Sequence, residues 1–223
     1  MNIALYLLPL LAINVFLLIR AEFRQDKRRI YILKPLCTLL VIAMALLSLR
    51  DPAHNTTYSV GVLIGLLLSF GGDMALMFQE QRKAFMLGLV LFLLAQVAYA
   101  VVFGLLGRSS TRDLFATALL VAVGVGFYLL MLPNLDRMRL PVAVYIVVIS
   151  LMVSRAVSTL ASPLFGASQA WMVAAGAILF YISDVILAAA RFWKPWPYHR
   201  ISLAFYYAGQ ALIALAASYF AAG

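Results

Sequence analysis

The sequence contains few of the residues from which metal sites and nucleophilic sites are usually built. Among 223 residues there is one cysteine, Cys37, there are two histidines, His54 and His199, and only 11% of the residues are charged. A lone cysteine excludes an intramolecular disulfide. The two histidines fall in different polar links, so they provide neither a zinc site nor the base for a serine nucleophile. We therefore expect no metal and no cofactor.

Hydrophobic residues make up 65% of the chain and form eight apolar blocks of about 20 residues, the length that a helix needs to cross a bilayer. The blocks are Asn2–Ile19, Tyr31–Leu49, Tyr58–Phe78, Ala84–Leu106, Leu114–Leu132, Pro141–Leu160, Gln169–Ala190 and Ile201–Phe220. The links are too short for a soluble domain. The first block lacks a preceding positive charge, so we interpret it as a helix and not as a signal peptide. The prediction is an all-α polytopic membrane protein with eight transmembrane helices in one domain, residues 1–223.

Positive charge is distributed unevenly between the links. Of the 17 lysines and arginines, 13 lie in or beside the odd-numbered links and three in the even-numbered links, while Arg155 lies inside a predicted helix. The positive-inside rule places the odd links in the cytoplasm and both termini on the other side. The net charge of +9 therefore fits anionic lipid headgroups better than nucleic acid, and we expect no nucleic-acid partner. The expected location is a bacterial inner membrane. The oligomeric state is not readable from this pattern.

Two aspartates interrupt the apolar blocks at the same depth. Asp73 and Asp184 each lie a turn or two, about 8–10 Å, from the predicted cytoplasmic end of a block. Other polar side chains fall near this level, with Gln210 about one turn deeper. These predicted substrate-binding or supporting residues are Lys34, Asn14, Tyr128, Tyr145, Tyr206, Tyr207 and Gln210. The pattern predicts a polar layer in the inner half of the bundle.

The two aspartate segments are also similar to each other. Aligning Asp73 with Asp184 matches Gly65 with Gly176, and the segments belong to the third and seventh blocks. This spacing indicates a possible parallel repeat of four helices followed by four. Such a repeat would place the two acids at an internal pseudo-symmetric interface, where membrane proteins often build sites.

An unpaired carboxylate in lipid costs at least about 2.5–3.5 kcal/mol, so both aspartates are candidates for function. In one alternative they are structural, bonded to tyrosine hydroxyls or paired with Lys34 or Arg155. In another, the protein is a transporter or lipid-binding protein whose paired aspartates relay protons or bind a cation. Lys34 could also simply extend to the membrane surface.

Two further stretches have competing interpretations. "FGG", residues 70–72, is more typical of a close helix contact than of a phosphate loop, because no Walker-type lysine follows it. "RFWKPWPYHR", residues 191–200, is typical of an interfacial anchor, with a lid or a phosphate-contacting loop as the alternative.

Five stretches together resemble the YhhN family, which includes the TMEM86 lysoplasmalogenases. They are "KPLCTLL", "GLLLSFGGDMALMF", "LPNLDRMRLPVAVY", "GAILFYISDVILAAARF" and "AFYYAGQALIA". The resemblance implies an eight-helix enzyme that cleaves the vinyl ether bond of a lysoplasmalogen with an ethanolamine or choline headgroup. The products would be a fatty aldehyde and glycerophosphoethanolamine or glycerophosphocholine. The positions it implies for the site are Lys34, Asp73, Asp184, Tyr207 and Gln210.

The implied chemistry agrees with the predicted polar layer. Vinyl ether hydrolysis needs a proton donor and a base, and two carboxyl groups can divide these roles if Lys34 or tyrosine hydroxyls keep one of them ionised. We therefore expect Asp73 and Asp184 to be catalytic, with a lysophospholipid and membrane lipids as partners. Two departures from the family pattern, Ala190 where asparagine is frequent and Gln96 where histidine is frequent, bear on substrate range.

Overall fold

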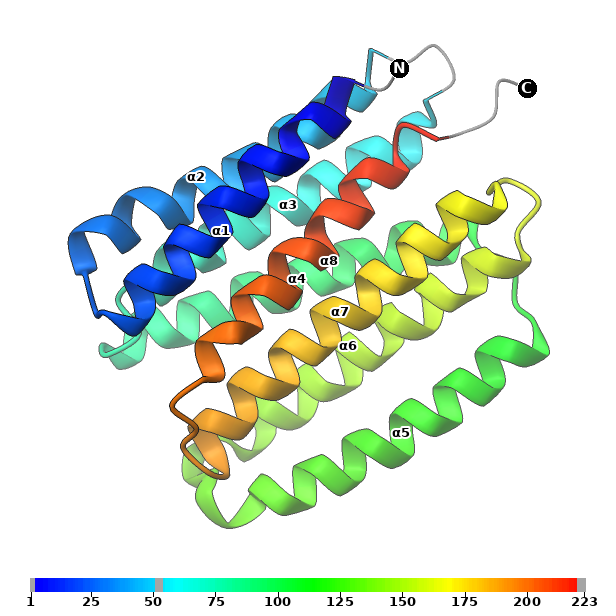
Figure 1. Cartoon of the computed structure of the whole chain (residues 1–223). Coiled ribbons are helices and arrows are strands. Elements are labelled where there is room, and N and C mark those ends of the chain that lie inside the picture. Colours follow the sequence, from blue (N-terminus) through cyan, green and yellow to red (C-terminus); the bar gives the residue numbers. More distant parts are fainter. Residues whose placement is uncertain (1–2, 51–53, 220–223) are drawn as a thin grey trace.

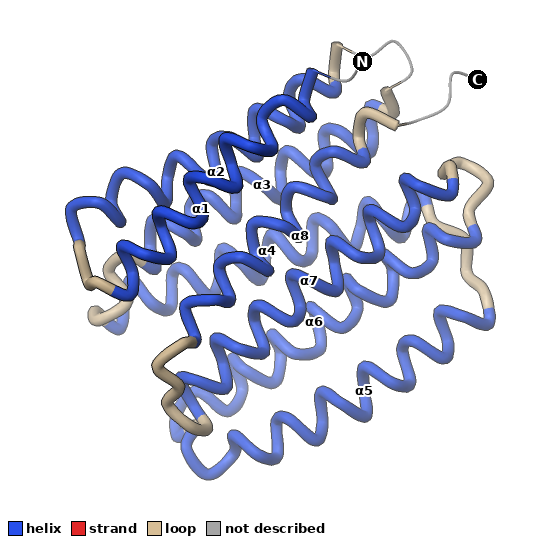
Figure 2. The backbone as a smooth tube through the Cα atoms, in the orientation of Figure 1, coloured by secondary structure: helices blue, strands red, loops and turns tan. Residues whose placement is uncertain are grey.

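The computed structural model describes residues 3–50 and 54–219, and over these ranges it is a bundle of eight α-helices and short 3-10 turns, with no strand. The helices run back and forth along one direction and are joined by short loops (Figures 1 and 2). Their bounds are α1 Leu7–Phe23, α2 Lys27–Ser48, α3 Thr56–Leu76, α4 Arg82–Leu106, α5 Thr111–Met131, α6 Arg139–Ser158, α7 Ala167–Phe192 and α8 Ser202–Ala216. The predicted all-α fold is confirmed.

Several helices begin before the apolar block that predicted them. α2 starts at Lys27 and not at Tyr31, because the Asp26 carboxylate accepts a hydrogen bond from the backbone of the first turn. The Asn55 side chain accepts one from the N–H of Tyr58 at 3.0 Å in the same way. Capping side chains satisfy the free N–H groups of a first turn, so polar residues set these boundaries. Residue 2 and residue 220, the predicted outer limits of the first and last blocks, lie outside the described ranges.

Within the described ranges, seven helices, α1 to α7, are long and apolar enough to cross a membrane. This makes the chain an integral multi-pass membrane protein. α8 is apolar too and has 15 residues, fewer than the predicted block Ile201–Phe220, whose last residue lies outside the described ranges. A 3-10 turn, His199–Ile201, precedes α8. α8 is packed among other helices. Burial requires apolar residues in the turns that flank it as well as in the helix itself. For this reason the apolar block is longer than the helix.

The helices form two halves, α1–α4 and α5–α8, with the same internal pairing. α3 packs closely along α4 in the first half, and α7 packs along α8 in the second. Between the halves, α4 packs on α6 and α8 packs on α2, which are equivalent pairs if α5–α8 repeats α1–α4. α5 lies at the edge of the bundle and packs mainly against α6 (Figure 1). This is the arrangement that a parallel repeat requires.

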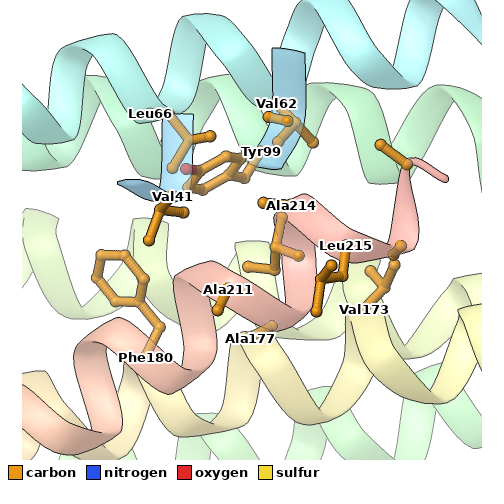
Figure 3. Packing of buried hydrophobic residues seen from close by; sticks show 14 of the residues in the cluster. Val41, Val62, Leu66, Tyr99, Val173, Ala177, Phe180, Ala211, Ala214 and Leu215 are labelled. Atoms are coloured by element: carbon orange, nitrogen blue, oxygen red, sulfur yellow. The ribbon is translucent and has the colours of Figure 1, made fainter. Parts of the chain in front are cut away.

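The apolar core lies where the two halves meet. Figure 3 shows Leu66 and Tyr99 of the first half side by side and facing Ala214 of α8, with Phe180 of α7 near Val41. A smaller apolar cluster lies apart from this core, between α5, α6 and the end of α7; its buried members are Met131, Leu135 and Val142. Residues of both clusters line one cavity, which forms the candidate site.

Candidate active site

A cavity of about 770 Å³ lies at the end of the bundle where α1 ends and α2 begins. Its wall includes the first, third and seventh links and residues from all eight helices or their ends. Asp73 of α3 and Asp184 of α7 both line it, as do Lys34, Tyr145 and Tyr206. The structure therefore brings the two aspartates predicted from depth to a single concave surface between the two halves.

Asp73 is held by three partners and is almost completely buried. The ammonium group of Lys34 lies 3.5 Å from Asp73 Oδ1. Thr38 Oγ1 and the Tyr206 hydroxyl donate hydrogen bonds to Oδ2, at 2.7 and 2.9 Å. A buried ion pair with additional hydrogen bonds is the arrangement that keeps a carboxylate charged away from water. Of the alternatives for Lys34, pairing with Asp73 is the one observed.

Close helix packing fixes this cluster in place. A Cβ atom at Gly72 would lie 2.7 Å from the Phe92 ring, so any larger residue at position 72 would force this ring to move. The Phe92 ring in turn packs edge to face on Tyr206, with 5.8 Å between the ring centroids. The "FGG" stretch is thus a helix contact, as its composition indicated. It sets the position of a residue that donates to Asp73.

Asp184 has a simpler environment. The Tyr145 hydroxyl donates a hydrogen bond to Asp184 Oδ2 at 2.7 Å, and both residues are half-buried. Among the described residues, no lysine, arginine or histidine side chain lies close enough to Asp184 to form an ion pair with it. The two acids of the cavity therefore differ in charge environment: one has a cationic partner and the other does not.

The offset of 111 residues that aligns Asp73 with Asp184 also aligns Lys34 with Tyr145. Each aspartate is thus contacted by the residue at the equivalent place in the preceding helix, a lysine in one half and a tyrosine in the other. The two halves have the same scaffold with different chemistry at one position. Because of this difference, a positive charge lies beside the Asp73 carboxyl group and a neutral hydroxyl lies beside the Asp184 carboxyl group.

Two predicted residues support the cluster from outside the cavity. The Tyr207 hydroxyl donates to the backbone carbonyl of Lys34 at 3.3 Å. Gln210 accepts a hydrogen bond from the Tyr99 hydroxyl at 2.7 Å and donates one to Ser69 Oγ at 3.0 Å. Neither Tyr207 nor Gln210 lines the cavity. They tie α8 to the first half at the depth of the site.

Two other predicted residues lie elsewhere. Asn14 donates to the carbonyl of Leu10 within its own helix at 2.8 Å, and the Tyr128 hydroxyl lies 3.4 Å from the carbonyl of Arg139. Neither side chain lines the cavity. Their depth matches that of the aspartates, but depth does not specify which face of a helix carries a residue.

Sequence reasoning missed Thr38, and it considered Arg191 only as part of a possible phosphate-contacting loop over residues 191–200; both residues belong to this region. Thr38 comes four residues after Lys34, so it lies on the same face of α2, and this spacing could have identified it. Arg191 lines the cavity with its guanidinium carbon 3.8 Å from the centroid of the Phe85 ring. In the part of the chain that the structure describes, no group of three or more histidine, cysteine, aspartate or glutamate side chains could hold a metal ion.

Residues 30–217 match the YhhN family. Among curated proteins, the chain is 36% identical over 163 residues to lysoplasmalogenase TMEM86A of Bos taurus, covering 70% of this chain and 64% of that protein. It is 35% identical over 162 residues to human lysoplasmalogenase TMEM86A, with the same coverage of both chains. It is 34% identical over 155 residues to human lysoplasmalogenase TMEM86B, covering 68% of this chain and 61% of that protein. The match thus spans less than two thirds of these relatives' length. No solved structure matches the chain.

Proposed function

The chain belongs to the YhhN family, and on this basis we propose that it is a lysoplasmalogenase, a membrane hydrolase of the vinyl ether bond in lysoplasmalogens. The relatives support this activity, since the similar TMEM86A and TMEM86B proteins are named lysoplasmalogenases. The substrate would be a lysoplasmenylethanolamine or lysoplasmenylcholine. The products would be a fatty aldehyde and the corresponding glycerophosphodiester.

One observation carries the proposal: two carboxyl groups, one with a cationic partner and one with a neutral hydrogen-bond donor, line one cavity in the membrane-spanning bundle. Asp73, paired with Lys34, is suited to act as a base and to stabilise positive charge. Asp184, without a cationic partner among the described residues, is suited to carry a proton, because an unpaired charge is costly away from water. The reaction needs one group of each kind.

The proposed reaction begins with proton transfer from the Asp184 carboxyl group to the carbon of the C=C bond that is not bonded to the ether oxygen. The π electrons form the new C–H bond, and positive charge is shared between the adjacent carbon and the ether oxygen. The Asp73 carboxylate stabilises this oxocarbenium ion electrostatically, as carboxylates do in glycoside hydrolysis. Tyr206 and Thr38 hold Asp73 in position through their hydrogen bonds to Oδ2.

Water then attacks the cationic carbon while Asp73 accepts the proton that the water loses, which gives a hemiacetal. In its collapse the bond from this carbon to the glycerol oxygen breaks. The glycerol oxygen takes the proton from Asp73, and the hemiacetal hydroxyl returns a proton to Asp184. Both side chains recover their starting states, and the net reaction consumes one water.

The direct test is aldehyde release by the purified protein in detergent micelles, without any ion gradient. The proposal expects turnover of 1-alkenyl lysophospholipid and no release from the 1-acyl analogue, which lacks the vinyl ether. A transporter would need sealed vesicles. Lack of aldehyde from folded protein, together with gradient-dependent uptake in proteoliposomes, would refute the enzyme and favour the transporter.

A further inference from the structure

Four lysine and arginine side chains line the cavity, and three of them have acidic partners. Lys34 pairs with Asp73, Lys27 with Glu80 at 3.4 Å, and Arg200 with Glu22 at 3.3 Å, as the structure records. The fourth is Arg191, near the end of α7. No aspartate or glutamate oxygen among the described residues lies within ion-pair distance of it. Arg191 is therefore the cation of the cavity wall whose charge is available to a ligand.

The Arg191 side chain is held by an aromatic ring and not by an acid. Its guanidinium carbon lies 3.8 Å from the centroid of the Phe85 ring, which also lines the cavity. Stacking on an aromatic face orients a guanidinium group but uses none of its N–H donors. A planar group with its donors free is suited to two parallel hydrogen bonds with a phosphate.

The spacing between Arg191 and Asp184 corresponds to the structure of the proposed substrate. The two residues are seven positions apart on α7, about 10 Å along the helix axis and on similar faces, and both line the cavity. In a lysoplasmalogen, six bonds separate the alkenyl carbon on the ether oxygen from the phosphorus, roughly 7–8 Å when extended. The span of the substrate is thus of the same order as the separation of the two residues along α7.

We propose that Arg191 is the phosphate-binding residue of the site and that it binds the phosphodiester oxygens of the lysophospholipid headgroup while the vinyl ether lies at Asp184. This inference rests on the proposed function and adds to it the orientation of the substrate. The headgroup lies toward the link between α7 and α8, and the ether end lies deeper in the bundle. Arg191 selects phospholipids over lipids of the same chain that lack phosphate.

A binding experiment tests this without turnover. The ligands are a 1-O-alkyl lysophosphatidylcholine, whose saturated ether cannot react, and the 1-O-alkylglycerol of the same chain length. Affinities are measured by tryptophan fluorescence in detergent micelles. Arg191→Gln is expected to weaken binding of the phospholipid by about 10–100-fold, the usual worth of a lost charged hydrogen bond, and to leave alkylglycerol binding unchanged.

The matched control is Lys194→Gln, since Lys194 is an exposed cation three residues further on that does not line the cavity. It should bind both ligands as the unmodified protein does. Arg191→Lys keeps the charge but loses the paired donors, so it should fall between the unmodified protein and Arg191→Gln. Equal phospholipid affinity in Arg191→Gln and the unmodified protein would overturn the proposal, as would an equal loss for both ligands.

Two further measurements separate the possible outcomes. If inorganic phosphate at millimolar concentration displaced the alkyl phospholipid completely, the site would bind a free anion and the headgroup assignment would be wrong. Aldehyde release is measured in parallel. If Arg191→Gln lost affinity for the phospholipid and the unmodified protein released no aldehyde, the phosphate site would be supported and the lysoplasmalogenase activity refuted. If Arg191→Gln released aldehyde with an unchanged KM, the lysoplasmalogenase activity would be supported and the phosphate-binding role of Arg191 refuted.

Discussion

At the scale of single residues, Asp73 and Asp184 share a cavity but differ in how each is stabilised. Asp73 has a lysine and two hydroxyl donors, whereas Asp184 has one tyrosine hydroxyl. Removing the ability to exchange a proton should therefore abolish a different step at each position. The side-chain amide of asparagine has the same shape and tests this with little change in packing.

Asp73→Asn and Asp184→Asn should each lower aldehyde release by at least about 10²–10⁴-fold, because each removes one partner of a general acid–base pair. The double variant should be little worse than the poorer single variant, since groups that act as a unit are not additive. Initial rates in detergent measure this, with size-exclusion profiles to check folding. Near-normal turnover by either single variant would contradict the paired mechanism.

A matched control is Asp136→Asn. Asp136 is exposed in the link between α5 and α6, away from the cavity, and has a φ of 42°, a conformation that asparagine also tolerates. It should retain full activity. An equal loss there would show that the assay responds to any lost carboxylate.

Thr38→Val removes the hydroxyl that donates to Asp73 while keeping the shape of the side chain. The expected loss is about 10–100-fold in kcat/KM, the cost of a hydrogen bond to a charged group. Thr38→Ser, which restores the donor, should recover most of the activity in the same kinetic assay. If the valine and serine variants were equally impaired, packing and not hydrogen bonding would account for the effect of Thr38.

The sequence predicted the central residues better than the outer ones. An ionisable residue in an apolar segment must face protein or water, so Asp73, Asp184 and Lys34 could be assigned to an interior site. Asn14 and Tyr128 were selected by depth alone. Depth follows from counting residues, but the direction of a side chain depends on helix rotation, which is set by packing across the whole bundle.

At the scale of helices, number and order were predictable, and boundaries and contacts were less so. Hydropathy detects burial in lipid or protein, so it located the eight helices but extended the last beyond the 15 residues of α8. Capping by Asp26 and Asn55 depends on side chains that hydropathy scores only as polar. The match of Gly65 with Gly176 did identify a structural feature, since both glycines lie where neighbouring helices pack closely.

Gly176→Ala should destabilise the protein in detergent by about 1–3 kcal/mol, the usual cost of overpacking. A Cβ atom at residue 176 would lie 2.8 Å from the backbone oxygen of Gly209, and backbone cannot move aside as a flexible side chain can. The control is Gly126→Ala on α5, where the added Cβ would meet no described atom within 4 Å beyond its own stretch of helix. Thermal unfolding should show a lower midpoint for Gly176→Ala only. Equal midpoints would mean that α7 and α8 are not in close contact there.

At the scale of the whole molecule, the two halves of the bundle have equivalent helix pairs and enclose the cavity between them. The sequence predicted this relation from the spacing of the two aspartates. It did not predict the cavity, because an empty volume depends on how side chains from many helices fill or fail to fill the interior. The cavity lies at the end of the bundle formed by the first, third and seventh links, which are rich in positive charge.

We therefore expect the cavity to open toward the cytoplasm, with both termini on the opposite side, because 13 of the 17 basic residues flank the odd-numbered links. Alkaline phosphatase fused to the C-terminus should be active in cells, and green fluorescent protein at the same place should be dark. Inserted between α3 and α4, the two reporters should behave in the opposite way, which provides the internal control. A fluorescent C-terminal fusion would reverse the topology and place the mouth of the cavity, with Arg191 and the two aspartates, on the outer leaflet.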